Sequence, residues 1–521
     1  MKNIIKKNFN SIFFILISLL ILSFSFFQSI SQHWSSVKDF DLTVIFNSLQ
    51  VISGNYQDFR EHPGYTQFII YGSFFKFFSF FDSELITNVD SFVNLYNPEN
   101  NLQKLFLIAR FANSVCLVIL IVFFYRICTI FDIERTLIYF SIISLLITDS
   151  FLSNLTILRA DLVAVSFFLI SFFYLMSFTK EKQKIIKIFI SSFFMILALL
   201  AKIQIVIMLI FILFFFPIFY KFQNNKNENI YDINKNFKSY IILYFILIFS
   251  FIVLQIFIHQ HPRFVDQNYL DLIVFIIFNF FYFFYLYLIS KKNFDLFKFN
   301  FSIFVLFIIG IILSIVFLNI LSYLNIFKLS PYILLRLSNP FYYLKVYSPI
   351  SNLNVDLEFL KNLATTTLDG FKINIINIAL LIIILFFSLF KDIQKNNNAH
   401  INYKIIFFLS FLLIILSFNF RYYLLYDIYY LPVYYLLICL CIKNFSKGLI
   451  YPIFIFFLLI NNNFLLTKKS NFEEYFSREH KLNHICLTYE TRHFYWWWAR
   501  KLDESFFKNL CLKQNLKFVY N

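Results

Sequence analysis

Apolar segments of about 20 residues recur along the chain, from about residue 11 to residue 466, with short polar breaks between them. A helix needs roughly 20 apolar residues to cross the hydrocarbon core of a bilayer, which is about 30 Å thick. Runs such as 117–124 and 205–216 are apolar on every face, whereas a strand of a membrane barrel alternates apolar and polar residues. The sequence therefore predicts an all-α polytopic membrane protein.

The composition supports the same conclusion. Of the 521 residues, 60% are hydrophobic and only 14% are charged, so the chain lacks the polar residues that a water-soluble surface requires. The formal net charge is +16, but the lysines are dispersed among short loops and form no basic face. We therefore expect the lipid bilayer, and not nucleic acid, as the partner of these lysines.

The distribution of lysines also predicts the topology. Lys2, Lys6 and Lys7 precede a first apolar run at 11–30, and no small-x-small cleavage site follows it, which predicts a retained span with a cytoplasmic amino terminus. Twelve further spans are expected at 104–125, 137–154, 162–178, 187–200, 203–220, 239–258, 270–289, 301–323, 373–390, 404–418, 428–442 and 449–466. This makes about 13 transmembrane helices in a plasma membrane, the bacterial inner membrane by expectation, with the carboxyl terminus outside.

The positive-inside rule tests this order, because each short loop that it assigns to the cytoplasm should carry lysine or arginine. Every such loop does: Lys180, Lys182, Lys184 and Lys187; Lys221, Lys226 and Lys235; Lys291, Lys292 and Lys298; Lys391, Lys395 and Lys404; Lys443 and Lys447. The least certain boundaries are 187–220, which Lys202 interrupts, and 64–81, which is long enough to be read as an extra span.

The outside part of this transmembrane region (1–466) comprises a first loop at 31–103 and a loop at 328–371, followed by a small outside tail at 467–521. The first loop contains Asp39 and Asp41, followed by an amphipathic stretch that predicts a helix lying in the membrane interface. Asn47, Ser48 and Gln50 are expected to face water on this helix. Either the two aspartates work at the level of the lipid headgroups, or they are solvated and favourable at a helix amino terminus.

Two further signals lie at predicted outer span ends. Arg159 and Asp161 close a tight turn, where ionisable residues at a membrane face indicate either a function or a structural ion pair. Lys202 is a lone cation at the top of a helical hairpin, where it either has a function or extends to the interface.

Taken in order, these patterns resemble the GT-C glycosyltransferases, in particular the branch with protein O-mannosyltransferases and bacterial aminoarabinose transferases. The patterns are an acidic residue in the first loop (Asp39 or Asp41), His62-Pro63-Gly64-Tyr65, Arg110 at the start of a span, Arg159-Ala160-Asp161, a Leu/Ala run ending in Lys202, and Arg421-Tyr422 before a late span. Relatives often have a second proline where this chain has Gly64. A glutamate after the first aspartate is missing, so a divalent metal ion stays an open question.

The resemblance implies transfer of a sugar from a polyprenyl-phosphate donor to an acceptor hydroxyl, with inversion, on the outer face. Asp39 or Asp41 would be the general base, and Asp161 would hold the acceptor, bind a metal ion or orient a cation. The cations Arg159, Lys202 and Arg421 would bind the donor phosphate, and His62, Arg110 and Tyr422 would contact substrate. The acceptor is not identified: protein, lipid and polysaccharide all fit.

Other classes of protein stay open. A transporter or flippase for lipid-linked sugars would also have many spans, and a polymerase or ligase would use a late loop such as 328–371. Four cysteines lie in or beside apolar spans and are expected to be reduced thiols: Cys116, Cys128, Cys439 and Cys441. Cys486 and Cys511 in the tail either form a disulfide or stay unpaired.

Overall fold

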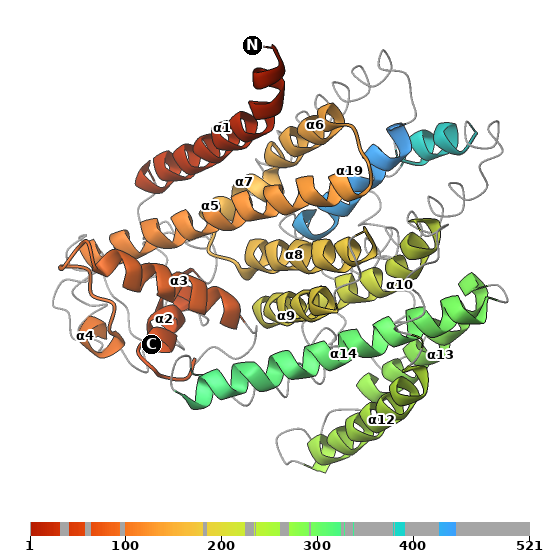
Figure 1. Cartoon of the computed structure of the whole chain (residues 1–521). Coiled ribbons are helices and arrows are strands. Elements are labelled where there is room, and N and C mark those ends of the chain that lie inside the picture. Colours follow the sequence, from red (N-terminus) through yellow and green to blue (C-terminus); the bar gives the residue numbers. More distant parts are fainter. Residues whose placement is uncertain are drawn as a thin grey trace, which may run out of the picture.

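In the computed structural model, every element is helical within the residues that the structure describes (Figure 1). These residues are 2–31, 41–57, 64–93, 99–180, 185–223, 234, 236–260, 270–290, 293–324, 328, 337, 379, 381–390 and 427–443. The helices are α1 (Lys2–Ser31), α2 (Asp41–Ile52), α3 (Tyr65–Ser79), α4 (Val89–Val93), α5 (Glu99–Ile130), α6 (Arg135–Leu146), α7 (Asp149–Thr156), α8 (Ala160–Lys180), α9 (Ile186–Ala201), α10 (Ile205–Gln223), α12 (Phe237–Gln260), α13 (Leu270–Ser290), α14 (Phe294–Tyr323) and α19 (Asp427–Ile442).

Five of the described helices are long and apolar enough to cross a membrane, namely α5, α8, α12, α13 and α14. Large hydrophobic side chains are exposed on α1, α12 and α13, such as Phe27, Phe249 and Phe280. A water-soluble protein would bury most of these side chains, but in a bilayer they contact lipid. The prediction of an α-helical membrane protein is thus confirmed at this level, whereas the count of 13 spans and the orientation stay predictions.

Helix α8 lies in the middle of the bundle, between α5 and α9 (Figure 1). Small polar residues let these helices approach closely, because a serine side chain adds little bulk between two backbones. The hydroxyl of Ser191 on α9 donates to the carbonyl of Ser171 on α8 at 2.7 Å, and Ser166 on α8 donates to the carbonyl of Cys116 on α5 at 2.9 Å. Helix α14 packs on the other side of α9, and α12 and α13 pack on α14.

The described helices outside the first loop overlap the predicted spans, and two of the differences between them have a local cause. The predicted span 137–154 is divided into α6 and α7, because Thr148 takes an extended backbone conformation and its hydroxyl donates to the carbonyl of Leu145. Helix α14 begins at Phe294 and not at 301, since the side chain of Asn293 caps it by accepting from the Leu296 amide at 3.1 Å. The predicted spans 404–418 and 449–466, the loop 328–371 except Lys328 and Leu337, and the tail 467–521 lie outside the described residues.

The segment 64–81 holds α3, which has 15 residues and is not among the five helices long enough to cross a membrane. One interpretation of the first outside loop is corrected. Helix α2 does not turn its polar residues to water, because Asn47, Ser48 and Gln50 are all buried. Asn47 and Ser48 instead donate to carbonyls one turn earlier in α2, and the helix packs against α3.

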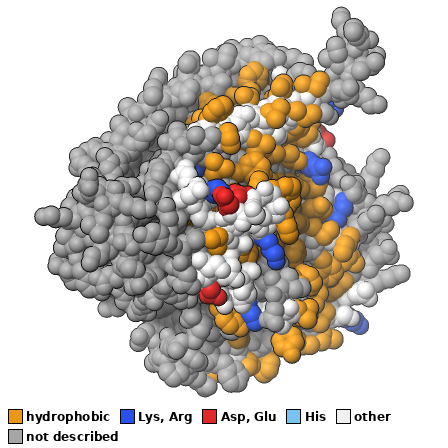
Figure 2. Space-filling model, turned by 90° about the vertical axis from the view of Figure 1, so that its left-hand side faces the viewer, with side chains coloured by type: hydrophobic (Ala, Val, Ile, Leu, Met, Phe, Trp, Pro, Cys, Tyr) orange, Lys and Arg blue, Asp and Glu red, His pale blue; other side chains and the backbone are white. Residues whose placement is uncertain are grey.

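The helix directions place the predicted site at one end of the bundle. Helix α8 begins and α9 ends at the end that carries α2 and α3, which we call the α2–α3 end (Figure 1). Figure 2 looks onto this end, where charged side chains lie in a strip of polar atoms beside hydrophobic side chains. On this surface Lys104 forms ion pairs with Asp82 at 2.7 Å and with Glu84 at 3.5 Å.

Candidate functional site

A short turn between α7 and α8 carries the two charged residues of the Arg-x-Asp pattern. Helix α7 ends at Thr156, Ile157 takes an extended conformation, and the Arg159 amide donates to the Ile157 carbonyl at 2.9 Å. Helix α8 then begins at Ala160, so Asp161 lies in its first turn. A carboxylate is favourable there because it interacts with the positive end of the helix dipole.

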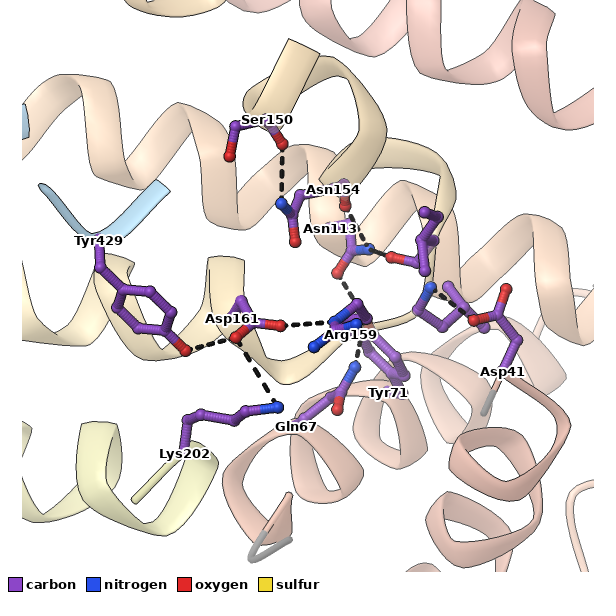
Figure 3. Close-up of polar contacts among 12 residues, drawn as sticks. Asp41, Gln67, Tyr71, Asn113, Ser150, Asn154, Arg159, Asp161, Lys202 and Tyr429 are labelled. Atoms are coloured by element: carbon purple, nitrogen blue, oxygen red, sulfur yellow. Dashed lines mark hydrogen bonds and ion pairs between the residues drawn. The ribbon is translucent and has the colours of Figure 1, made fainter. Parts of the chain in front are cut away.

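The Asp161 carboxylate is fully buried and has three partners from different parts of the chain (Figure 3). The Nε of Arg159 lies 2.8 Å from Oδ2, and the Nζ of Lys202 lies 3.7 Å from Oδ1. The hydroxyl of Tyr429, from α19, donates to Oδ1. Arg159 and Asp161 thus form the ion pair that was one of the two interpretations of this pattern, and Lys202 pairs with the same carboxylate.

The charges of this group, which we call the Asp161 cluster (Arg159, Asp161, Lys202 and Tyr429), do not cancel. Two cations surround one carboxylate, so the cluster carries one excess positive charge when Asp161 is ionised. The side chains of Arg159 and Lys202 are 12% and 5% exposed, which means that little water screens this charge. Such an arrangement favours the binding of an anion.

The position of Lys202 is set by contacts between two segments that the sequence patterns singled out. Helix α9 ends at Ala201, whose carbonyl accepts from the Gly64 amide at 3.0 Å, and the Thr66 hydroxyl donates to the Leu197 carbonyl at 2.7 Å. Gly64 has a φ of +54°, which proline cannot adopt, and a Cβ there would lie 2.7 Å from the Phe68 ring. Glycine therefore fits this backbone, whereas proline would not.

Asp41 lies on the other side of the same turn (Figure 3). It is buried, and its Oδ1 accepts a hydrogen bond from the Leu158 amide at 3.0 Å. The buried guanidinium of Arg110 interacts electrostatically with it and lies 5.5 Å from the centre of the Phe106 ring. Asp41 does lie at the amino terminus of a helix, but the interpretation of it as solvated is wrong, since its carboxylate is buried and bonded within the protein.

Sequence reasoning missed two features of the site. Tyr429 lies in a tyrosine-rich segment from which the sequence patterns singled out only Tyr422. Asn113, three residues after Arg110, was not singled out, yet its side chain donates to the carbonyls of Asn154 at 3.0 Å and Ile157 at 3.2 Å. An asparagine inside an apolar span was the available signal, because a polar side chain there needs partners.

Four predicted site residues lie outside the described residues: Asp39, His62, Arg421 and Tyr422. Among the described residues, no group of three or more His, Cys, Asp and Glu side chains is arranged to hold a metal ion. The Asp161 carboxylate itself does not suit a divalent cation, because Arg159 and Lys202 would repel it. The four described cysteines, Cys116, Cys128, Cys439 and Cys441, are buried free thiols, as expected.

No family model, curated protein or solved structure matches this chain.

Proposed function

We propose that this protein is a membrane glycosyltransferase of the GT-C type, which moves a sugar from a polyprenyl-phosphate donor to an acceptor hydroxyl at the outer membrane face. The observation that carries the proposal is the Asp161 cluster, with its buried excess positive charge at one end of a membrane-spanning helix. A lipid-linked phosphate presents its charge at this level of a bilayer. The α2–α3 end would be the outer end, in agreement with the lysines at the opposite end.

In the proposed reaction, the acceptor oxygen attacks the anomeric carbon while the bond from that carbon to the phosphate oxygen breaks. The leaving phosphate gains negative charge in the transition state, so cations fixed near it lower the barrier. Arg159 and Lys202 supply this charge, and Arg421 is a third candidate. Asp161 holds both described cations in place, since its two oxygens already bind them.

The general base takes the proton of the acceptor hydroxyl. Asp41 is the weaker of the two candidates, because it is buried, bonded to the Leu158 amide and close to Arg110. We therefore assign the base to Asp39, and we regard Arg110 as a partner of Asp41 and not as a sugar-binding residue. His62 and Tyr422 stay candidates for substrate contact.

Two buried amide oxygens suit the hydroxyl groups of a sugar. Asn154 Oδ1 and Gln204 Oε1 have no hydrogen-bond partner within the part of the chain that the structure describes. Gln204 follows Lys202 by two residues, and Asn154 lies on α7, one helix before Asp161. Each oxygen can accept a hydrogen bond from a hydroxyl, which would make these residues part of the donor-sugar site.

A flippase for lipid-linked sugars is the second candidate. Two observations favour it: Arg110 is a buried charge inside the apolar helix α5, and α6 and α7 form a discontinuous helix, as in many transporters. A flippase would move the lipid-linked sugar between leaflets without breaking its phosphate bond.

The test uses purified protein in liposomes that contain a radiolabelled polyprenyl-phosphate sugar and an extract of candidate acceptors. We expect label to move to an acceptor as polyprenyl phosphate is released, and Arg159→Ala or Lys202→Ala to lower this rate by about 10²–10³-fold. Lys221→Ala, at the opposite end of the bundle, is the control and should leave the rate unchanged. Movement of intact donor between leaflets without release of polyprenyl phosphate would overturn the proposal in favour of the flippase.

A further inference from the structure

The backbone of the turn before Asp161 is held from two helices by side chains. From α2, Asp41 accepts a hydrogen bond from the Leu158 amide at 3.0 Å. From α5, the Asn113 amide group donates to the carbonyls of Asn154 and Ile157 at 3.0 and 3.2 Å. Three backbone polar groups within residues 154–158, from two peptide groups, are thus bound by two side chains, immediately before Arg159 (Figure 3).

Asn113 is itself oriented by α3. Its Oδ1 accepts from the hydroxyl of Tyr71, which in turn accepts from the side-chain amide of Gln67 at 3.0 Å. All three side chains are buried. Because the side-chain oxygen of Asn113 is bound to Tyr71, its amide nitrogen points to the turn. Asn113 is therefore the donor in its hydrogen bonds to the Asn154 and Ile157 carbonyls.

Through these contacts, side chains from α2, α3 and α5 set the position of the backbone that carries Arg159 of the Asp161 cluster. Arg159 follows Leu158 directly, so a shift of the Leu158 peptide group moves the Arg159 side chain with it. A misplacement of about 1 Å is enough to lower the rate of an enzyme by about 10²-fold. The geometry of the two cations therefore depends on residues that contact neither of them in the described network.

We infer that Asp41 and Asn113 are positioning residues: they fix the 157–159 backbone so that the Asp161 cluster presents its net positive charge to a lipid phosphate. This inference rests on the proposed function and deepens it. Asp41 acts as a hydrogen-bond acceptor for the turn and not as the proton acceptor of the reaction. Through Tyr71, the segment that precedes α5 also sets the geometry of the cluster.

Conservative variants separate the two roles of Asp41. Asp41→Asn keeps an oxygen that accepts from the Leu158 amide but cannot act as a base, whereas Asp41→Leu loses both properties. Because Arg110 faces Asp41, each variant is also made together with Arg110→Gln. For Asn113, Asn113→Asp keeps the oxygen for Tyr71 and loses the two donors, and Asn113→Leu loses all three bonds.

Two serines supply matched controls on the same helices. Ser48→Ala on α2 and Ser114→Ala on α5 each remove a fully buried hydroxyl whose hydrogen bond lies within its own helix. Neither hydroxyl bonds to the turn. All variants must elute as monodisperse protein in detergent before they are compared.

The first readout is hydrogen–deuterium exchange of peptides that cover 150–165, measured without ligand. The second is the affinity for C55 polyprenyl phosphate in nanodiscs, and the third is the turnover of the liposome assay. We expect Asp41→Leu and both Asn113 variants to speed exchange at 157–159 and to weaken phosphate affinity at least tenfold. Asp41→Asn should stay within about threefold of the wild type in affinity and turnover. The two serine variants should equal the wild type in exchange, affinity and turnover.

The results separate this inference from the proposed function. If the wild type binds polyprenyl phosphate and Asp41→Leu and Asn113→Leu bind it equally well, the positioning role is wrong and the proposed function stands. If Asp41→Asn loses turnover by 10²-fold or more while its affinity and exchange are unchanged, Asp41 is a base and the inference is overturned. If the wild type binds no polyprenyl phosphate, the proposed function fails, and the exchange data alone decide whether these residues fix the turn.

Discussion

Helices α8 and α13 each contain 21 residues and carry an aspartate in the first turn, yet they lie in different surroundings. Both are apolar enough to cross a membrane, but 78% of the spanning window of α8 is buried inside the protein, compared with 17% for α13. Hydropathy alone does not distinguish a helix at the centre of the bundle from one that faces lipid.

The polar residues do distinguish them. Helix α8 contacts its neighbours through serines, as in the bonds of Ser166 to α5 and of Ser171 to α9. Helix α13 instead contacts α10 through the long side chains of Tyr282 and Tyr285, whose hydroxyls donate to carbonyls of α10. Small polar residues permit close packing on several sides, whereas large aromatic residues bridge a wider separation and leave other faces to lipid.

The largest losses of stability and turnover are expected when the first-turn aspartates of these two helices are replaced. Asp161→Asn removes the carboxylate that pairs with Arg159 and with the buried Lys202, which costs about 3–5 kcal/mol of stability and at least 10²-fold in turnover. Asp271→Asn in α13 is the matched change, and it should lower stability and turnover less than Asp161→Asn does. Thermal unfolding in one detergent and the liposome assay measure the difference, and equal losses would contradict the comparison.

Close packing through small residues is tested at Gly310 of α14. A Cβ at this position would lie 2.5 Å from the Oγ and 2.7 Å from the Cβ of Ser192 on α9, so Gly310→Ala must push the two helices apart. We expect a loss of about 1–3 kcal/mol in the unfolding free energy. The double variant Gly310→Ala/Ser192→Gly removes the clash and should recover part of the loss. If the double variant is no more stable than Gly310→Ala, the clash with Ser192 is not the cause of the lost stability.

A smaller effect is expected where a tyrosine bridges two helices that face lipid. The hydroxyl of Tyr244 on α12 donates to Oδ1 of Asn279 on α13 at 2.7 Å. Tyr244→Phe removes this bond but keeps the ring, so the expected loss of stability is about 0.6–1.7 kcal/mol, the range for polar contacts between membrane helices. Chemical denaturation in mixed micelles measures it. A loss as large as that of Asp161→Asn would remove the distinction between the two regions.

The smallest effect concerns an exposed carboxylate at the α2–α3 end. The hydrogen bond from Lys104 lowers the pKa of Asp82. The folded-state pKa is therefore below the unfolded one, so the contribution to stability is present above about pH 4 and is lost as the pH falls through the folded-state value. We expect the difference in melting temperature between the wild type and Asp82→Asn to be about 1 °C or less at pH 7 and to become smaller as the pH falls below about 4. A difference in melting temperature that grows as the pH falls would contradict a lowered pKa of Asp82 in the folded protein.

Most helix positions could be predicted because a long apolar run is a local property of the chain. The break at Thr148 was not predicted, since the backbone there leaves the helix within a run that remains apolar. The side of α2 that faces water was predicted wrongly, because amphipathic spacing shows that one face is polar but not what that face meets. Asn47 and Ser48 satisfy their polar groups within the helix and are then buried against other elements.

For the site, the sequence by itself determined the pair Arg159 and Asp161, since two residues in one turn are close in any fold. It also determined that the chain is a membrane protein, because 60% hydrophobic residues exclude a water-soluble surface. Only the tertiary structure decided that Lys202 and Tyr429 join the same carboxylate and that Asp41 binds the backbone of the turn. Such contacts join residues as far apart as 268 positions in the chain, and they depend on how the helices pack and not on any local pattern.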